Sequence, residues 1–318
     1  MRLAAFIALA LLGCASASAE PYHFIPGRVP LDWQGPDGNS IIFDAPQGLI
    51  VVDTGRSPMH AQAILDYAKQ RHRPIAAIVN SHWHLDHTTG NFDIRQAFPN
   101  AKVYASTAIE GALVGFLNNG RAQGDKVLAD PKTSEGQKAQ LLRGRYRVDH
   151  PDTLRPTNPV VRSGRVTIAG RRLEVHLAKF AATEGDVWIY DPASRTAIVG
   201  DLVVGLVPFM DTACADGWSK ALDEVAAVPF QTVIPGHGDP MSRADFLSWR
   251  KAYNDFVACG RSNADKQQCV DGWTSEAARF IDDEHRGYAR GAAAYYLDTR
   301  LRSSPEEQQK YCRPLKAS

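Results

Sequence analysis

Four short apolar runs, rich in Ile and Val, are the clearest pattern along the chain. In order they are "LIVVD" (49–53), "IAAIVN" (75–80), "TAIVGD" (196–201) and "TVIPGH" (232–237). Their length and β-branched content predict strands buried on both faces, as in the sheets of layered α/β proteins. Each run ends in, or just before, side chains that can bind a ligand, and strand ends of such sheets meet in one crevice. We therefore expect the four ends to form one site.

Other segments have the period of a helix or of a hairpin. After the first run, Ser57 is suited to cap a helix and Pro58 to occupy its first position. The apolar residues of that helix share one face: Ala61, Ile64, Leu65 and Ala68. Residues 160–178 alternate around Gly164 and Gly170, which predicts an antiparallel hairpin. From about Met241 onward the pattern is helical.

The composition is that of a globular protein without a dominant charge. Apolar residues make up 44% of the 318 positions and charged residues 22%, which is ordinary for a folded chain. The 36 Lys and Arg residues nearly balance the 35 Asp and Glu residues, so no global field attracts a nucleic acid. We expect a small-molecule substrate and no nucleic-acid partner.

The first 19 residues have the pattern of a secretory signal peptide. Arg2 supplies the positive charge, residues 3–12 the apolar run, and residues 17–19 the small side chains before the cleavage site. The run is too short for a permanent membrane helix. A second interpretation takes "LLGC" as a lipoprotein signal, in which a lipid on Cys14 would provide membrane contact. In both cases we expect a periplasmic or secreted protein.

The other four cysteines are expected to form disulfides, because export leads to an oxidising compartment. They are Cys214, Cys259, Cys269 and Cys312, and four thiols allow three pairings. The segment between Cys259 and Cys269 is short, polar and turn-rich, which makes that bridge the most natural one. A Cys214–Cys312 bridge then follows by elimination. None of the four has a C-x-x-C spacing, so we expect structural cysteines.

The stretch "NSHWHLDHTTGN" (80–91) holds three of the chain's ten histidines and one aspartate. On extended backbone His82 and His84 point to one side, because side chains alternate with a period of two. Asp86 and His87 follow where the chain turns into the next helix, so they face a different point. Imidazole and carboxylate are common zinc ligands. The spacing therefore predicts two neighbouring metal positions that share one loop.

The pattern H-x-H-x-D-H after a buried strand resembles that of the metallo-β-lactamase superfamily. Further pieces lie in that family's order: "VVDTG" (51–55) upstream, and "VGDLV" (199–203) and "IPGHG" (234–238) downstream. The similarity spans roughly residues 22–260. It implies an α/β protein, a four-layer αβ/βα sandwich with its active site at one edge of two sheets. We assign residues 20–260 to this domain and residues 261–318 to a C-terminal helical extension packed on it.

The resemblance also implies the ligands of two zinc sites. These are His82, His84 and a third histidine for the first site, Asp86, His87 and His237 for the second, and Asp201 as the bridge between them. The third histidine belongs to a G-H-T-x-G segment, but here "AKFAATEG" (178–185) carries Ala182 at that position. Alanine binds no metal. We therefore expect one firmly bound zinc at the second site and at most a weak second zinc at the first.

Residues around these ligands have expected roles too. Alternative candidates for the missing ligand are His176, Glu184 and Asp186. In the family that the chain resembles, the aspartate of D-T-G orients the loop and the ligands, so Asp53 is expected beside the metal but outside its ligand set. The remaining histidines are expected at the surface: His23, His60, His72, His150 and His285.

These features predict an exported zinc-dependent hydrolase. Zinc lowers the pKa of bound water to about 7, so a zinc-activated water would cleave a small ester, lactone, thioester or lactam. Asp86 would orient that water, and His82 and His84 would act as general base or oxyanion donor. The alternative is a catalytically degenerate periplasmic binding or accessory protein that retains a structural zinc. Residues 116–137 and 202–218 are expected to be long loops around the pocket. The sequence assigns no oligomeric state.

Overall fold

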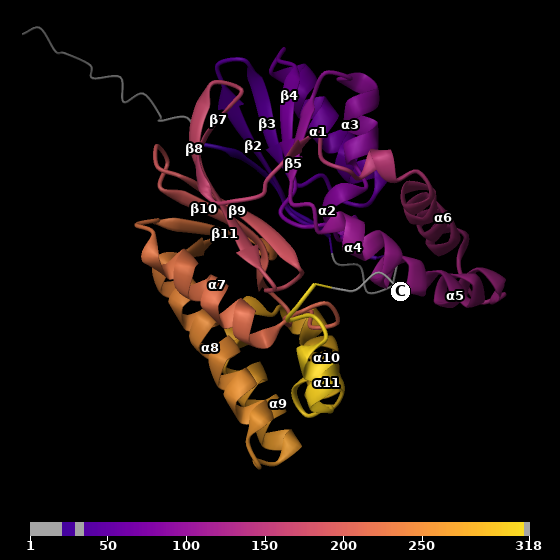
Figure 1. Cartoon of the computed structure of the whole chain (residues 1–318), viewed down its shortest axis with the longest axis vertical. Coiled ribbons are helices and arrows are strands. Elements are labelled where there is room, and N and C mark those ends of the chain that lie inside the picture. The colour runs from indigo at the N-terminus through magenta and orange to yellow at the C-terminus, as the bar shows by residue number, and fades with distance from the viewer. Residues whose placement is uncertain (1–20, 29–34, 315–318) are drawn as a thin grey trace, which may run out of the picture.

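The computed structural model describes residues 21–28 and 35–314 as two sheets covered by helices (Figure 1). The first sheet comprises, in spatial order, β1 (His23–Ile25), β2 (Ser40–Ala45), β3 (Gly48–Val52), β4 (Ile75–Val79), β5 (Lys102–Ala105) and β6 (Asn158–Pro159). The second comprises β12 (Met241–Ser242), β11 (Thr232–His237), β10 (Thr196–Val204), β9 (Gly185–Asp191), β8 (Arg171–Lys179) and β7 (Gly164–Ile168). The predicted signal peptide and Cys14 lie outside the described residues.

Helices follow the strands and lie on the outer faces. Those before β10 are α1 (Pro58–Gln70), α2 (Leu85–Thr88), α3 (Asn91–Ala97), α4 (Ile109–Val114), α5 (Phe116–Ala129), α6 (Glu135–Asp149) and the 3₁₀ turn η1 (Pro151–Thr153). Those after it are α7 (Ala215–Ala227), α8 (Arg243–Arg261), α9 (Lys266–Glu276), η2 (Ala278–Phe280), η3 (Asp283–His285), α10 (Arg286–Tyr296), the π-helical turn η4 (Leu297–Leu301) and α11 (Pro305–Gln309).

The four apolar runs form β3, β4, β10 and β11, as predicted. Every residue of these strands is buried except Ala76 and Thr232, which are partly buried. β3 pairs with β4 in parallel, and β10 pairs with β11 in parallel. Parallel pairing places the carboxyl ends of both strands of a pair at one edge. The hairpin of β7 and β8 is antiparallel and turns at Ala169 and Gly170, which both have positive φ.

Three hydrophobic cores separate four layers. One lies between the sheets and includes Phe43 and Val52 from the first sheet with Val175 and Ile189 from the second. A second packs α1 and α3 on the first sheet. The third packs α7, α8, α9 and α10 on the second sheet, and Figure 1 displays α7 and α8 across that face. This is the αβ/βα sandwich that the resemblance implied, with the predicted helical C-terminal region present.

Helix α1 begins at Pro58 as predicted, but its His60 is buried rather than exposed. Ser57 caps the helix by accepting a hydrogen bond from His60 N. The expectation that His60 is a surface residue is wrong, because it is 6% exposed. The ring lies on the buried face with Ile64 and Ala68, at the helical spacing of four residues. Its Nε2 contacts Ser40 Oγ at 2.7 Å.

The expected loop at 116–137 is also wrong, because most of that segment is helical. α5 ends at Ala129, and α6 follows a capping box in which Ser134 and Gln137 exchange hydrogen bonds. In Figure 1 these two helices project away from the sheets. The second expected loop is shorter than predicted, since β10 continues to Val204 and α7 begins at Ala215.

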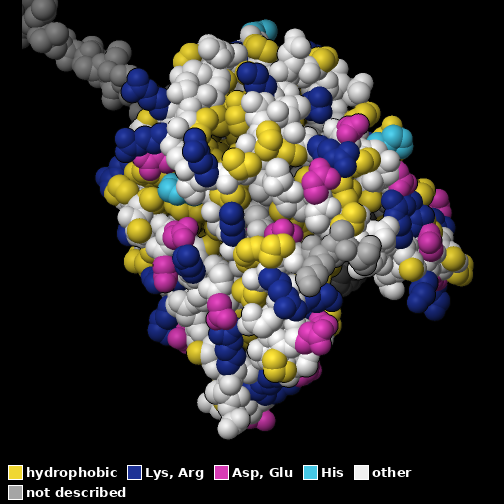
Figure 2. Space-filling model, in the orientation of Figure 1, with side chains coloured by type: hydrophobic (Ala, Val, Ile, Leu, Met, Phe, Trp, Pro, Cys, Tyr) yellow, Lys and Arg dark blue, Asp and Glu magenta, His cyan; other side chains and the backbone are white. Residues whose placement is uncertain are grey.

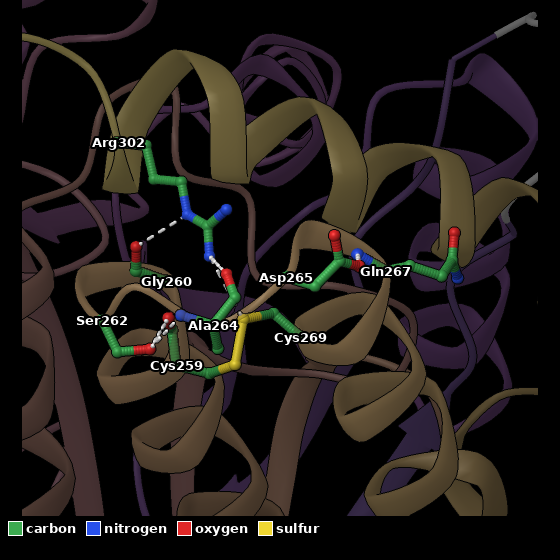
Figure 3. The surroundings of a disulfide bond; sticks show 8 residues. All are labelled: Cys259, Gly260, Ser262, Ala264, Asp265, Gln267, Cys269 and Arg302. Atoms are coloured by element: carbon green, nitrogen blue, oxygen red, sulfur yellow. Dashed lines mark hydrogen bonds between the residues drawn. A yellow bond between two sulfur atoms is a disulfide. The ribbon is translucent and has the colours of Figure 1, made fainter.

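Both predicted disulfides are present. Cys214 is joined to Cys312, and Cys259 to Cys269. The second links α8 to α9, and beside it Arg302 donates hydrogen bonds to the carbonyls of Gly260 and Ala264 (Figure 3). The C-terminal helices share the core of the second sheet, and the domain boundary at residue 260 stays a prediction.

The surface agrees with the balanced composition. Figure 2 shows basic and acidic side chains intermixed over the visible face, in keeping with a formal net charge of +1. Within the described ranges, none of the helices combines the length and apolarity needed to cross a membrane.

Two helical glycines should respond oppositely to substitution by alanine. In Gly217→Ala the new Cβ would lie 1.7 Å from the carbonyl oxygen of Phe180, so we expect a loss of about 1–3 kcal/mol of unfolding free energy. Gly272 in α9 has open space around it, so Gly272→Ala should gain about 0.5–1 kcal/mol from helix propensity. Urea denaturation of both variants measures the difference. A Gly217→Ala protein as stable as wild type would contradict the close packing of α7 on the loop at Phe180.

Candidate metal centre

The ends of four strands bring the predicted site residues together at one edge of the two sheets. Asp53 follows β3, the histidine loop follows β4, Asp201 lies in β10, and His237 ends β11. A link across the sheets fixes this arrangement: Asn39 N donates to the carbonyl of Gly236, and Asn39 Nδ2 donates to that of Pro235. The convergence of strand ends expected from the sequence is therefore present.

Four donor atoms form a closed ring at this edge. His87 Nε2 lies 3.2 Å from Asp201 Oδ1 and 3.7 Å from Asp86 Oδ2. His237 Nε2 lies 3.2 Å from Asp86 Oδ2 and 3.6 Å from Asp201 Oδ1. Zinc bonds of about 2.0–2.1 Å to tetrahedral ligands place neighbouring donor atoms about 3.3 Å apart. Asp86, His87 and His237 form one group of candidate ligands within 4.8 Å of one another, and Asp201 Oδ1 lies close enough to two of them to share the same ion.

Several of the buried donor atoms have no other partner. Among the described residues, His82 Nε2, His87 Nε2 and Asp201 Oδ1 are buried without a hydrogen bond, a costly state unless a cation or proton pairs with them. Burial lowers the pKa of His87, but the surrounding carboxylates, Asp201 foremost, outweigh it and raise that pKa well above its ordinary value. The centre thus favours additional positive charge, which a divalent cation supplies.

Asp53 contacts one imidazole directly and a second one through Ser81. Its Oδ2 accepts hydrogen bonds from His87 Nδ1 at 2.8 Å and Ser81 Oγ at 2.6 Å. Because Ser81 Oγ donates to Asp53, it accepts from His82 Nδ1 at 2.9 Å. Both rings therefore donate through Nδ1 and direct Nε2 toward the centre, where a cation would take the place of any proton on Nε2. Asp53 adopts a left-handed backbone, with φ 56°, which aspartate tolerates better than most residues.

The first predicted metal position has fewer donors. His82, His84 and Asp201 form a group whose candidate ligand atoms lie within 4.8 Å of one another, and His82 Nε2 lies 3.6 Å from Asp201 Oδ2. Thr212 connects Ala182 to this group. Its Oγ1 donates a hydrogen bond to the carbonyl of Ala182 at 3.0 Å and contacts His84 Nε2 at 3.1 Å. The methyl side chain at this place adds no ligand atom.

Thr212 also sets the tautomer of His84. A threonine hydroxyl has one proton, and here it goes to the Ala182 carbonyl. The contact with His84 therefore requires His84 Nε2 to donate, which leaves Nδ1 as the acceptor. The sequence around Thr212 did not predict this contact, because Thr212 and His84 are 128 positions apart.

The alternative candidates for the missing ligand are directed elsewhere. His176 stacks on Trp188, with ring centroids 3.7 Å apart. Asp186 accepts hydrogen bonds from the backbone and hydroxyl of Thr183, and burial raises its pKa to about 7. Glu184 Oε2 lies against Gly111. In the part of the chain that the structure describes, none of the three belongs to a group able to hold a metal ion.

A pocket of about 560 Å³ opens onto the centre. Asp86, Asp201 and His237 line it on the metal side, with His84 beside them. Much of the remaining wall is apolar or aromatic, including Trp83, Phe116, Leu117, Leu206, Phe209 and Tyr296. A pocket of this size suits a small organic molecule.

Some of the lining was missed by sequence reasoning. Arg56 lies next to the D-T-G motif, which could have drawn attention to it, and its Nη2 lies 3.5 Å from Asp86 Oδ1. His285, expected at the surface, is half-buried and lines the pocket with Tyr288 and Tyr296. These three residues come from η3 and α10, and no local pattern connects them to the metal motifs.

Comparisons with known proteins agree with this geometry. Residues 33–237 match the family described as the metallo-beta-lactamase superfamily. Over 223 residues the chain is 28% identical to a linear primary-alkylsulfatase from Pseudomonas sp. (strain ATCC 19151), an alignment that covers 63% of this chain. It covers 41% of that relative, so the chain spans less than half of the relative's length.

Solved structures resemble the fold. The sec-alkylsulfatase Pisa1 from Pseudomonas sp. superposes with a TM-score of 0.55 at 21% identity, over 81% of this chain and 47% of that one. A metallo-beta-lactamase from Hirschia baltica superposes with a TM-score of 0.50 at 18% identity, over 74% of this chain and 98% of that one.

Gly38→Ala should weaken metal binding although Gly38 itself provides no donor atom. A Cβ at this position would lie 2.4 Å from His87 Cε1 and 2.9 Å from His87 Nε2, so the ring would have to move. We expect zinc affinity to fall about tenfold to a hundredfold, as when residues that orient ligands are lost. Competition with a chromophoric chelator measures the affinity. Gly120→Ala, where no atom lies within 4 Å of the new Cβ, is the control. Equal affinities in the two variants would show that Gly38 does not constrain His87.

Proposed function

This chain belongs to the metallo-β-lactamase superfamily of metal-dependent hydrolases, and we propose that it is an exported enzyme that uses one firmly held zinc ion. The proposed substrates are small esters, lactones, thioesters or lactams. The observation that carries the proposal is the ring of Asp86, His87, Asp201 and His237, whose donor atoms lie close enough to bind one zinc ion and of which all but His87 line a pocket.

The residues of the chain have distinct parts in this chemistry. When bound at the ring, zinc supplies Lewis acidity that activates water and polarises a carbonyl. Asp86 lines the pocket and can orient the attacking water through its carboxylate. Burial lowers the pKa of His84 to about 4, so its imidazole is neutral at pH 7. With Nε2–H held by Thr212, His84 can accept a proton at Nδ1.

His82 is the second candidate for a catalytic role. Its Nε2 faces Asp201 Oδ2 at 3.6 Å, and it is fully buried beneath the pocket rather than part of its lining. We assign it to the weak first metal position together with His84 and Asp201. Any second zinc would bind there with fewer protein ligands than the first.

Export rests on the amino-terminal pattern and on the cysteines. Residues 1–19 have the charge, apolar run and small residues of a signal peptide. Two disulfides in a chain of this size are typical of oxidising compartments. We therefore propose a periplasmic or secreted location.

A second candidate activity is hydrolysis of alkyl sulfate esters. The relative at 28% identity is a linear primary-alkylsulfatase, and the pocket combines an apolar wall with Arg56, which could contact a sulfate. Arg56 already lies 3.5 Å from Asp86, so we rank carboxylic esters first. The alternative without catalysis is an accessory protein with a structural zinc, which the absence of a ligand side chain at Ala182 favours.

Removing one histidine at a time should locate the firm metal position. His237→Ala breaks the four-donor ring, so we expect it to lose most of its zinc after dialysis. His84→Ala leaves the ring intact, so it should keep about one zinc per chain. Elemental analysis measures both, with His72→Ala, an exposed histidine, as the control. The assignment is contradicted if His84→Ala loses as much zinc as His237→Ala.

Restoring the family's third histidine should separate an enzyme from a binding protein. A hydrolase with a depleted first position should, as Ala182→His, bind more zinc and change its hydrolysis rate, whereas an accessory protein should gain zinc alone. The panel contains p-nitrophenyl esters, a thioester, a lactone, a β-lactam and an alkyl sulfate. The hydrolase proposal would be contradicted if the wild-type protein bound less than about one zinc per chain and hydrolysed no substrate of this panel.

A further inference from the structure

Part of the pocket wall lies outside the region that matches the family. The match ends at residue 237, whereas Tyr288 and Tyr296 of α10 line the pocket. The loop between β10 and α7, which lies earlier in the chain, contributes Leu206 and Phe209 to the same pocket. We refer to Leu206, Phe209, Tyr288 and Tyr296 as the C-terminal wall.

Aromatic contacts connect the C-terminal wall to the metal centre. The ring of Phe209 lies 5.2 Å from that of His84 and 6.2 Å from that of Tyr296, between centroids. Phe116 lies 6.3 Å from His84 and 5.6 Å from Trp83. These spacings are those of packed aromatic pairs. An apolar surface therefore runs from the catalytic edge to α10.

The C-terminal wall is held by covalent and polar contacts. The Cys214–Cys312 disulfide ties the start of α7 to the segment after α11. Arg300 Nη2 donates to the backbone carbonyl of Asp211 at 2.7 Å and lies 3.2 Å from its carboxylate. Asp211 belongs to the same loop as Phe209, and Arg300 belongs to η4, so these contacts fix that loop against the C-terminal segment that follows α10.

The pocket contains little positive charge that could bind an anionic group of a substrate. Among the described residues that line it, Arg56 is the sole lysine or arginine, and Asp86 already lies 3.5 Å from it. Apolar surface removed from water is the main source of affinity in such a pocket.

We propose that the C-terminal wall binds the apolar acyl group of the substrate, so that the preferred substrates are esters or thioesters of straight-chain acids of several carbons. This inference rests on the proposed hydrolase function and specifies its substrate class. The wall would then select against acetyl esters, which leave it unfilled, and against substrates with a free carboxylate.

A series of p-nitrophenyl esters from acetate to octanoate tests the proposal. For the zinc-loaded wild-type protein, kcat/KM should rise about twofold to fourfold with each added methylene until the pocket is filled. Tyr296→Ala and Phe209→Ala should each reduce the octanoate-to-acetate ratio roughly tenfold. The control is Leu247→Ala, since Leu247 lies on α8, is 40% exposed and is not part of the lining. It should keep the wild-type ratio.

The disulfides provide a second matched pair. Replacing Cys214 and Cys312 together by alanine should lower the octanoate-to-acetate ratio, because the loop bearing Phe209 loses its covalent tie. Replacing Cys259 and Cys269 together should not, because that bridge joins α8 to α9 (Figure 3) and neither cysteine lines the pocket. Circular dichroism establishes that each double variant is folded.

The outcomes distinguish this inference from the proposed function. Ester hydrolysis without chain-length preference, or a Tyr296→Ala ratio equal to wild type, overturns the acyl-binding wall and leaves the hydrolase. No hydrolysis of any substrate in the full panel, by protein that binds less than about one zinc, overturns the proposed function. In that case calorimetric titration with ethanol, butanol, hexanol and octanol decides the wall: affinity that rises with chain length and falls in Tyr296→Ala supports it, and affinity independent of chain length overturns it.

Discussion

The structure depends on placing three carboxylates in its interior around a small set of imidazoles. Asp53, Asp86 and Asp201 are 2%, 7% and 5% exposed, and buried charges of one sign are tolerated only when they are compensated. Asp53 is compensated by hydrogen bonds from Ser81 and His87. Asp86 and Asp201 both lie near Nε2 of His87 and of His237. A cation bound by the two carboxylates would offset the repulsion between them. The fold on either side serves to bring these groups from separate strands to one point.

Close backbone approach makes that convergence possible. A Cβ on Gly236 would lie 1.9 Å from Asp201 Oδ1, and one on Gly200, where φ is +53°, would lie 2.4 Å from Ser81 Cβ. The pairing of β10 with β11 shifts register on both sides of Gly200, as strands often do beside active sites. The missing side chain at Gly200 allows the two sheets to approach each other at Ser81, and the one at Gly236 leaves room for the Asp201 carboxylate within the second sheet. The position of the Asp201 carboxylate at the metal centre thus depends on the backbone conformation at these two glycines.

The sequence predicted those parts of the molecule whose physics is local. Apolar runs bounded by ligand-bearing residues predicted β3, β4, β10 and β11, and the spacing from His82 to His87 predicted a shared metal loop. It failed for α5 and α6, where glycines and polar residues gave a loop-like pattern although the segment is helical. It also missed Thr212 and Tyr296, whose positions depend on packing between distant segments. Contacts of that kind leave no period or motif along the chain.

The two disulfides are nested, and this has a consequence for how the chain must oxidise. The Cys259–Cys269 bridge, with a sequence separation of 10, lies inside the Cys214–Cys312 bridge, with a separation of 98. Joining these four cysteines in order along the chain would therefore give the wrong pairs. Ring closure is entropically easier for the shorter loop. Once the inner ring has closed, Cys312 is the one partner left for Cys214 among the cysteines that the structure describes. The link between α8 and α9 therefore reduces the number of ways in which the longer cross-link can pair, although neither of its cysteines lines the pocket.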